Sequence, residues 1–287
     1  MIVAMMGNMT ILIDFFLKPI TYHFMQRGMI AAVLVGIVCA VVGTYIVLRG
    51  MAFFGDALAH TILPGIALGY LVSGGARDTL FWWALGTAIF AALGIGAISK
   101  NSEIKEDTAI GIIFAGMFAL GIALISTVHK YAVDLSHFLF GDVLSVSTHS
   151  LWLILIFGGI VLLTVFLFYK EFMTLSFDPV LAATLRLPVD LLNNLLLILI
   201  AVTVAVSLQT VGVALMVAML VTPAATAYLL THRLSHMMLL AAIFASFSGV
   251  IGLYLSYYLS IASGAAIVLT ATVFFMVSFG WKRMKPT

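Results

Sequence analysis

The sequence predicts an all-α polytopic membrane protein with about nine transmembrane helices. Hydrophobic residues make up 64% of the 287 residues and charged residues only 8%, whereas a soluble globular domain has roughly 25% charged residues. Uncharged runs long enough for a helix to cross a hydrocarbon core of about 30 Å recur between polar breaks. These runs lack the alternation of polar and apolar residues that membrane β-strands show. The predicted fold is therefore a bundle of membrane-spanning helices.

Each long uncharged run is taken as one span. The sixth and seventh runs are separated only by Gln209 and Thr210, so a very tight hairpin is required there, and eight or ten spans are alternatives. The nine predicted spans are 28–48, 57–73, 79–99, 108–128, 150–169, 191–208, 211–230, 237–259 and 262–281.

Basic residues in short segments next to the spans predict the orientation, because they stay on the cytoplasmic side. Lys282, Arg283 and Lys285 place the C-terminus in the cytoplasm and, through nine spans, the N-terminus outside. Residues 1–26 lack the pattern of a signal peptide and are predicted to form an interfacial amphipathic segment. Residues 27–287 then form one transmembrane domain. The net charge of +2 gives no reason to expect nucleic acid as a partner.

Asp56 and His60 are the most informative polar residues, because they lie four residues apart in a chain that is nearly free of charge. That spacing places both side chains on one face of a helix, where a carboxylate oxygen and an imidazole nitrogen can meet one cation. Ionisable groups in a membrane segment usually face a cavity or a partner. The alternative is structural: Asp56 caps the start of the helix and His60 bonds a neighbouring carbonyl group.

Two prolines predict interruptions of membrane helices next to a pathway. Pro64 cannot donate a hydrogen bond to the carbonyl of His60, and Pro223 likewise frees the carbonyl of Met219. Broken helices at membrane depth usually line binding cavities. For Pro223 the alternative is a kinked packing helix, since Ala224, Ala225 and Ala227 would allow close helix contact.

A short helix is predicted in residues 177–190, between the fifth and sixth spans. Asp178 is a plausible N-cap, Pro179 takes the first helical position, and Pro188 ends the element. By the charge count this segment lies on the cytoplasmic side, where a capped amphipathic helix can dock a partner.

The segment 128–150, predicted to lie outside, carries several polar side chains that can attract a divalent cation or a partner protein. Their spacing matches no compact metal motif, so solvated loop residues are the alternative. They are His129, Asp134, His137, Asp142 and His149.

No nucleotide-binding P-loop and no hydrolase motif occurs in the sequence. The chain itself is therefore not expected to be an enzyme, and any ATP hydrolysis must come from another subunit. Two alternatives are an ion-driven secondary metal transporter, with Asp56 as the only candidate acid in a span, and an intramembrane metalloenzyme, which would need a third ligand.

Five segments of the sequence are similar to the permease subunits of bacterial ATP-binding-cassette importers for manganese, zinc and iron(II), the ABC-3 metal ion family. The similarity extends from about Arg27 to Trp281. It is most specific at GDALAH followed by LPG. The segments are LRGMAFFGDALAHTILPGIALGYL, DTAIGIIFAGMFALGIAL, FLFGDVL, FDPVLAATLRLPV and LQTVGVALMVAMLVTPAATAYLL.

This resemblance implies the fold of the vitamin B12 importer class (type II) and a place in the bacterial cytoplasmic membrane. It implies that two copies form the pathway, that an ABC ATPase subunit docks beneath each, and that an extracellular solute-binding protein delivers the metal. It makes Asp56 and His60 the intramembrane metal ligands. The cargo is a divalent metal with manganese favoured and zinc or iron(II) as alternatives, and no cofactor is permanently bound. The coupling helix would be the segment 178–187, with Asp178, Pro179, Ala182, Ala183 and Leu187.

Overall fold

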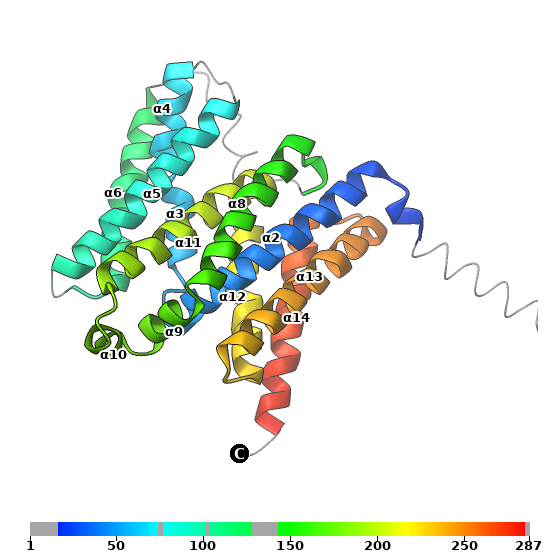
Figure 1. Ribbon diagram of the computed structural model, residues 1–287. Coiled ribbons are helices and arrows are strands. Elements are labelled where there is room, and N and C mark those ends of the chain that lie inside the picture. Colours follow the sequence, from blue (N-terminus) through cyan, green and yellow to red (C-terminus); the bar gives the residue numbers. More distant parts are fainter. Residues whose placement is uncertain (1–16, 74–76, 102–103, 128–142, 285–287) are drawn as a thin grey trace, which may run out of the picture.

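The computed structural model describes residues 17–73, 77–101, 104–127 and 143–284, and its regular elements there are helices (Figure 1). Nine of the described segments are long and apolar enough to cross a membrane, which confirms the predicted number. The elements are α2 (His23–Leu48), α3 (Phe54–Thr61), α4 (Leu63–Ser73), α5 (Arg77–Asn101), α6 (Glu106–Ser126), η1 (Val143–Ser145), α8 (Thr148–Leu167), α9 (Tyr169–Phe177), α10 (Pro179–Thr184), α11 (Val189–Val211), α12 (Val213–Leu230), α13 (Leu234–Leu259) and α14 (Ser263–Met284).

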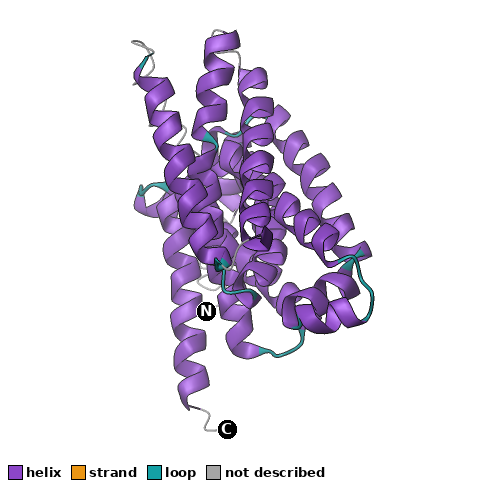
Figure 2. Cartoon of the chain, turned by 90° about the vertical axis from the view of Figure 1, so that its left-hand side faces the viewer, coloured by secondary structure: helices purple, strands orange, loops and turns teal. Residues whose placement is uncertain are grey.

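The helices form two groups that meet at α3 and α11. In one group α4, α5 and α6 pack against one another, at the upper left of Figure 1. In the other, α2, α12, α13 and α14 pack together. Figure 2 shows the whole bundle of helices turned by 90° from the view of Figure 1. The short helix α3 contacts α5 and α6 of the first group as well as α11 and α12. The element that carries Asp56 and His60 therefore lies where the two groups meet.

The predicted spans agree with the observed helices to within three residues at every boundary except the first, and two of the differences have a clear physical cause. The first span begins at His23 rather than residue 28, because Arg27 lies within the helix. The turn between α11 and α12 is at Gly212 rather than at Gln209 and Thr210, which are helical. Gly212 has φ 80° and ψ 170°, a conformation that only glycine adopts without strain. Most of the predicted N-terminal segment and the residues His129, Asp134, His137 and Asp142 lie outside the described residues.

The contact between α2 and α12 is very close. A Cβ atom added at Gly43 would overlap the backbone carbonyl oxygen of Leu220, so only glycine permits the observed separation. Small residues at helix contacts provide stabilisation in membranes, where lipid removes the hydrophobic driving force between helices.

We therefore expect Gly43→Ala to lower the free energy of unfolding by roughly 1–3 kcal/mol, because the backbone of α2 or α12 must move. Thermal unfolding in detergent, followed by tryptophan fluorescence, measures this change. Gly86→Ala is the matched control, since no atom lies within 4 Å of a Cβ at that position of α5. Equal unfolding temperatures for the two variants would contradict the role assigned to Gly43.

Candidate metal-binding site

The short helix α3 follows α2 through a compact turn. Gly50 has φ 70°, the amide of Met51 donates to the carbonyl of Ile46, and the amide of Phe54 donates to the carbonyl of Met51. Most of α3 is then buried, including the side chains of Phe54, Ala57, Leu58 and Ala59. The two ionisable residues of α3, Asp56 and His60, are half-buried.

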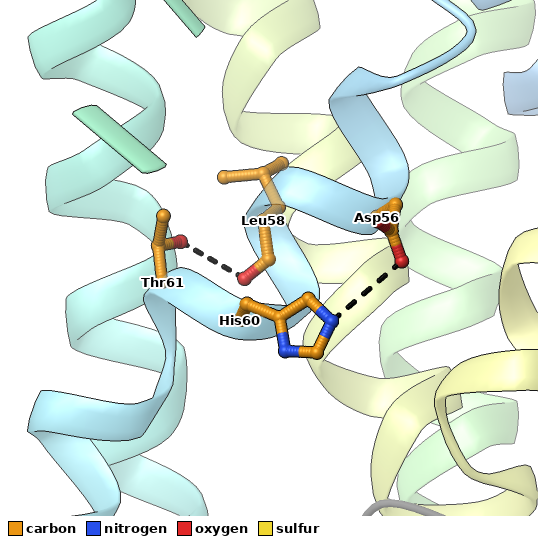
Figure 3. Close-up of polar contacts among 4 residues, drawn as sticks. All are labelled: Asp56, Leu58, His60 and Thr61. Carbon is orange, nitrogen blue, oxygen red and sulfur yellow. Dashed lines mark hydrogen bonds and ion pairs between the residues drawn. The ribbon is translucent and has the colours of Figure 1, made fainter. Parts of the chain in front are cut away.

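Asp56 and His60 point toward one another across one helical turn (Figure 3). Oδ1 of Asp56 lies 3.8 Å from Nε2 of His60, and the two side chains are 35% and 25% exposed. This distance is too long for a hydrogen bond. The same distance leaves room for a divalent metal ion that binds both atoms, since ligand distances of about 2.0–2.2 Å allow two ligand atoms to lie this far apart.

The structural alternative for these residues finds little support. The N-cap of α3 is Phe53, and no side chain caps the helix, so Asp56 is not its cap. Nδ1 of His60 is buried and has no hydrogen-bond partner in the described part of the chain. Thr61 satisfies its own hydroxyl by donating to the carbonyl of Leu58 at 2.9 Å, as Figure 3 shows.

Two phenylalanines of α6 fix the ring of His60, and sequence reasoning did not identify them. The centroid of the His60 ring lies 5.9 Å from that of Phe114 and 5.5 Å from that of Phe118, with interplanar angles of 66° and 78°. Phe114 and Phe118 stack on each other at 5.7 Å. Edge-to-face contacts of this kind restrict ring orientation. The available signal was their own spacing of four residues, which places both rings on one face of a helix.

The second span is interrupted near Pro64, as predicted. α3 ends at Thr61, and α4 begins at Leu63 with Pro64 in its first turn. The carbonyl of His60 is not free, however, because it accepts a hydrogen bond from the amide of Ile62. The break packs against α6, where Gly121 lies close to Leu63 and Pro64.

The break predicted at Pro223 is not found, because α12 continues through this residue from Val213 to Leu230. Pro223 is buried. One turn earlier, Leu220 packs against Gly55 of α3. α12 therefore packs against α3 at Gly55. The packing interpretation of Pro223 fits the structure better than a broken helix that lines a pathway.

The short helix after the fifth span has the predicted start and an earlier end. Oδ1 of Asp178 accepts hydrogen bonds from the amides of Val180 and Leu181, and Pro179 occupies the first turn. The helix ends at Thr184 because Arg186 adopts φ 59°. The amide of Arg186 donates to Ala183 and that of Leu187 to Ala182, which is a Schellman closure with a non-glycine residue in the left-handed position.

The side chains of this segment divide into a buried and an exposed set. Ala182 is fully buried and Leu187 is half-buried, so Ala182 packs within the chain and cannot offer the docking contact that was expected of it. Apolar side chains are nevertheless exposed here, which is unusual for a segment outside the membrane spans. They are Phe177, Val180, Leu181 and Leu185, with exposed fractions of 57%, 73%, 47% and 59%.

A family model for the ABC 3 transport family matches residues 21–282. The chain belongs to the ABC 3 transport family. Its membership agrees with the predicted family and with the nine apolar helices, so the protein is a multi-pass membrane transport component.

Three relatives illustrate the range of this ABC 3 family. The manganese transport system membrane protein MntC of Halalkalibacterium halodurans is 46% identical over 96% of this chain and 91% of its own length. The chelated iron transport system membrane protein YfeD of Yersinia pestis is 38% identical over 97% and 92%. A solved structure of PsaBC from Streptococcus pneumoniae in complex with Fab matches with a TM-score of 0.80 and 40% identity, over 93% of this chain and 95% of that chain.

Proposed function

We propose that this chain is the permease subunit of an ATP-driven importer of divalent transition-metal ions in the bacterial cytoplasmic membrane. Manganese is the favoured cargo, with zinc and iron(II) as alternatives. The observation that carries the proposal is the pair of Asp56 and His60, oriented toward each other beside a helix break at the junction of the two helix groups. The names of the relatives, which refer to manganese and iron, support the choice of metal.

The donor set suits transport rather than permanent binding. One carboxylate and one imidazole, without a thiolate, bind Mn(II), Fe(II) and Zn(II) and hold none of them irreversibly. In the described part of the chain no group of three or more His, Cys, Asp or Glu side chains converges on a metal site. The alternative of an intramembrane metalloenzyme, which needs a third ligand and a base, therefore gains no support.

A second copy of the chain would complete the coordination. Two pairs related by a two-fold axis supply two carboxylates and two imidazoles. Helix α6, next to His60, presents an exposed face in which small residues alternate with larger ones, whereas α8 exposes large side chains such as Trp152, Ile156 and Phe166. Small residues favour contact with another helix and large ones contact with lipid. The small exposed residues of α6 are Ala115, Gly116, Ala119 and Ala123.

Charge and position at the two ends of the bundle support a placement for the other proposed subunits. The C-terminal end of α14 carries Lys282 and Arg283, which favour a cytoplasmic location. The α10 segment lies at the same end as the C-terminus in Figure 1. We therefore place the ATPase subunit at α10, and a solute-binding protein at the opposite, extracellular end.

Transport into proteoliposomes tests the function. Vesicles that hold this chain with its ATPase subunit and solute-binding protein should accumulate radiolabelled manganese only when ATP is supplied on the ATPase side. Manganese accumulation without the ATPase subunit, driven by an imposed proton or sodium gradient, would instead establish an ion-driven secondary transporter.

Zinc is expected to inhibit manganese uptake in these vesicles without itself accumulating. The Irving–Williams order gives zinc the higher affinity for Asp56 and His60, so bound zinc should leave the site slowly. Uptake of each radiolabelled metal, with the other as competitor, measures this. Saturable zinc accumulation that manganese does not affect would contradict the preference for manganese and would leave the permease assignment in place.

A further inference from the structure

Arg49, at the C-terminal end of α2, makes a side-chain contact that the site described above does not use. Its Nη2 donates to Oδ1 of Asn193 in α11 at 2.6 Å, and the two residues are 144 positions apart in the sequence. Nη1 of Arg49 is buried without a hydrogen-bond partner among the described groups. Placing a guanidinium in such surroundings costs free energy unless its contacts are favourable. The contact with Asn193 is therefore a specific link between α2 and α11.

Arg49 lies next to the turn that leads into α3, the helix that carries the two proposed metal ligands. Arg49 precedes the compact turn into α3, in which the amide of Met51 donates to Ile46 at 3.0 Å and the amide of Phe54 to Met51 at 2.9 Å. Met51 is itself buried, with 2% of its surface exposed. A displacement of Arg49 should therefore move the start of α3, where Asp56 lies.

On the other side the link leads to residues 178–187, the segment that contains α10 and is here called the docking segment. α11 begins at Val189, separated from this segment only by Pro188, and the amide of Val189 donates to the carbonyl of Leu187 at 2.8 Å. The amide of Leu192 donates to the carbonyl of Pro188 at 3.0 Å. The first turns of α11, which carry Asn193, should consequently move together with the docking segment.

A third element acts on Arg49 through charge. Burial lowers the pKa of the Arg49 guanidinium, and the negative charge of Glu106 offsets part of this lowering. Glu106 begins α6, the helix whose Phe114 and Phe118 contact the ring of His60. Arg49 is thus connected to the docking segment, to the carboxylate donor and to the helix that fixes the imidazole donor.

We propose that Arg49 is a positioning residue that transmits movement of the docking segment, through Asn193 and α11, to Asp56 and His60 on α3. This rests on the proposed function as an ATP-driven importer. In this role Arg49 does not touch the metal; it couples the state of the ATPase to the geometry of the two donors.

The test uses the complex with its ATPase subunit and solute-binding protein in proteoliposomes and compares Arg49→Met and Asn193→Leu with the wild type. We expect manganese binding to the complex without ATP, and ATP hydrolysis itself, to stay within about twofold. Manganese transported per ATP hydrolysed should fall about tenfold, in the range typical of a coupling free energy between two sites. The double variant should lose no more than either single variant, because both changes break the same link.

Two further variants keep the result interpretable. Asn193→Asp retains the acceptor oxygen and should transport manganese per ATP as the wild type does. Lys100→Met removes a neighbouring contact to the start of α11, the 2.8 Å ion pair with Asp190, whose side chains are 57% and 63% exposed. An exposed pair of this kind contributes little, so this control should keep normal coupling.

An unchanged ratio of manganese to ATP in both Arg49→Met and Asn193→Leu, or an equal loss in Lys100→Met, would overturn the proposal. Additive losses in the double variant would do the same. A wild-type complex that hydrolyses ATP without any manganese transport would instead contradict the proposed function. The two failures are therefore distinguishable.

Discussion

Manganese accumulation should fall by more than about 100-fold in vesicles that carry Asp56→Ala or His60→Ala. Replacing a residue that only hydrogen-bonds to a metal ligand already lowers affinity or activity by about 10–100-fold, so loss of a ligand itself should cost more. Each substitution removes one of the two side chains proposed to bind the metal, and in the described residues no third His, Cys, Asp or Glu joins them in a group that could hold a metal. Uptake of radiolabelled manganese measures transport, and metal analysis of the purified complex measures binding. Both should fall together.

Matched substitutions separate this effect from a general loss of charge. His236 in α13 and Asp107 in the first turn of α6 are exposed, and their alanine variants should transport normally. Asp56→Asn preserves the shape of the side chain and removes its charge, so it should lose nearly as much uptake as Asp56→Ala. The assignment fails if both alanine variants at the site accumulate manganese and zinc at wild-type rates while the ATPase subunit remains bound.

Phe118→Ala is expected to have a smaller effect than loss of either donor. The His60 ring would lose its edge-to-face contact at 5.5 Å and gain rotational freedom, a contribution of about 0.5–1.5 kcal/mol. We expect manganese affinity to fall about threefold to tenfold, which titration of the purified complex would measure. Phe90→Ala, a change at a 71% exposed phenylalanine of α5, is the control, and equal affinities in the two variants would contradict the role of Phe118.

The helices could be predicted from the sequence because charges are rare and mark the ends of most spans. This signal fails where a charged residue lies inside a helix. Arg27 is exposed within α2, and its long side chain can reach a polar surface while the helix continues. The observed start at His23 therefore precedes the uncharged run by several residues.

The two prolines show what local rules leave open. Pro64 lies in the first turn of α4, where a missing amide donor is harmless, and α3 ends before it. Pro223 has the same chemistry in the middle of α12, yet that helix is continuous and buried there. Neighbouring helices decide this outcome, and a single sequence does not reveal which neighbours a proline will have.

The pair of Asp56 and His60 was predictable because both residues lie on one short helix. The residues that hold this site in place from other helices were not predictable. Phe114 and Phe118 contact His60 from another span, and Asn193 contacts Arg49 across 144 positions. Such contacts depend on how the helices pack, which sequence spacing within one element does not encode. The same limit led to Ala182 being predicted as a docking residue, although packing against the rest of the chain buries it.

A charge on the exposed apolar side chains of the docking segment should release the proposed ATPase subunit. Leu185→Lys and Val180→Lys each place an ammonium group where the structure exposes an apolar side chain, 59% and 73% exposed. Burying that charge against a partner is costly. We expect each variant to weaken binding of the ATPase subunit about 30-fold, the effect of losing a hot-spot contact of about 2 kcal/mol. Co-purification at limiting ATPase concentration measures it.

Leu259→Lys supplies the matched control, because Leu259 is 62% exposed and ends α13 at the opposite end of the bundle, where Tyr257 contacts Tyr22 just before α2. It should bind the ATPase subunit normally. Ala182→Lys would be a poor test, since a lysine at a fully buried position disrupts the segment whether or not a partner docks there.

Full ATPase binding and full ATP-driven uptake in both Leu185→Lys and Val180→Lys would show that the docking surface lies elsewhere. Arg49 would then lack a moving partner, so the link through Asn193 would lose its proposed role in coupling and keep only its contribution to packing.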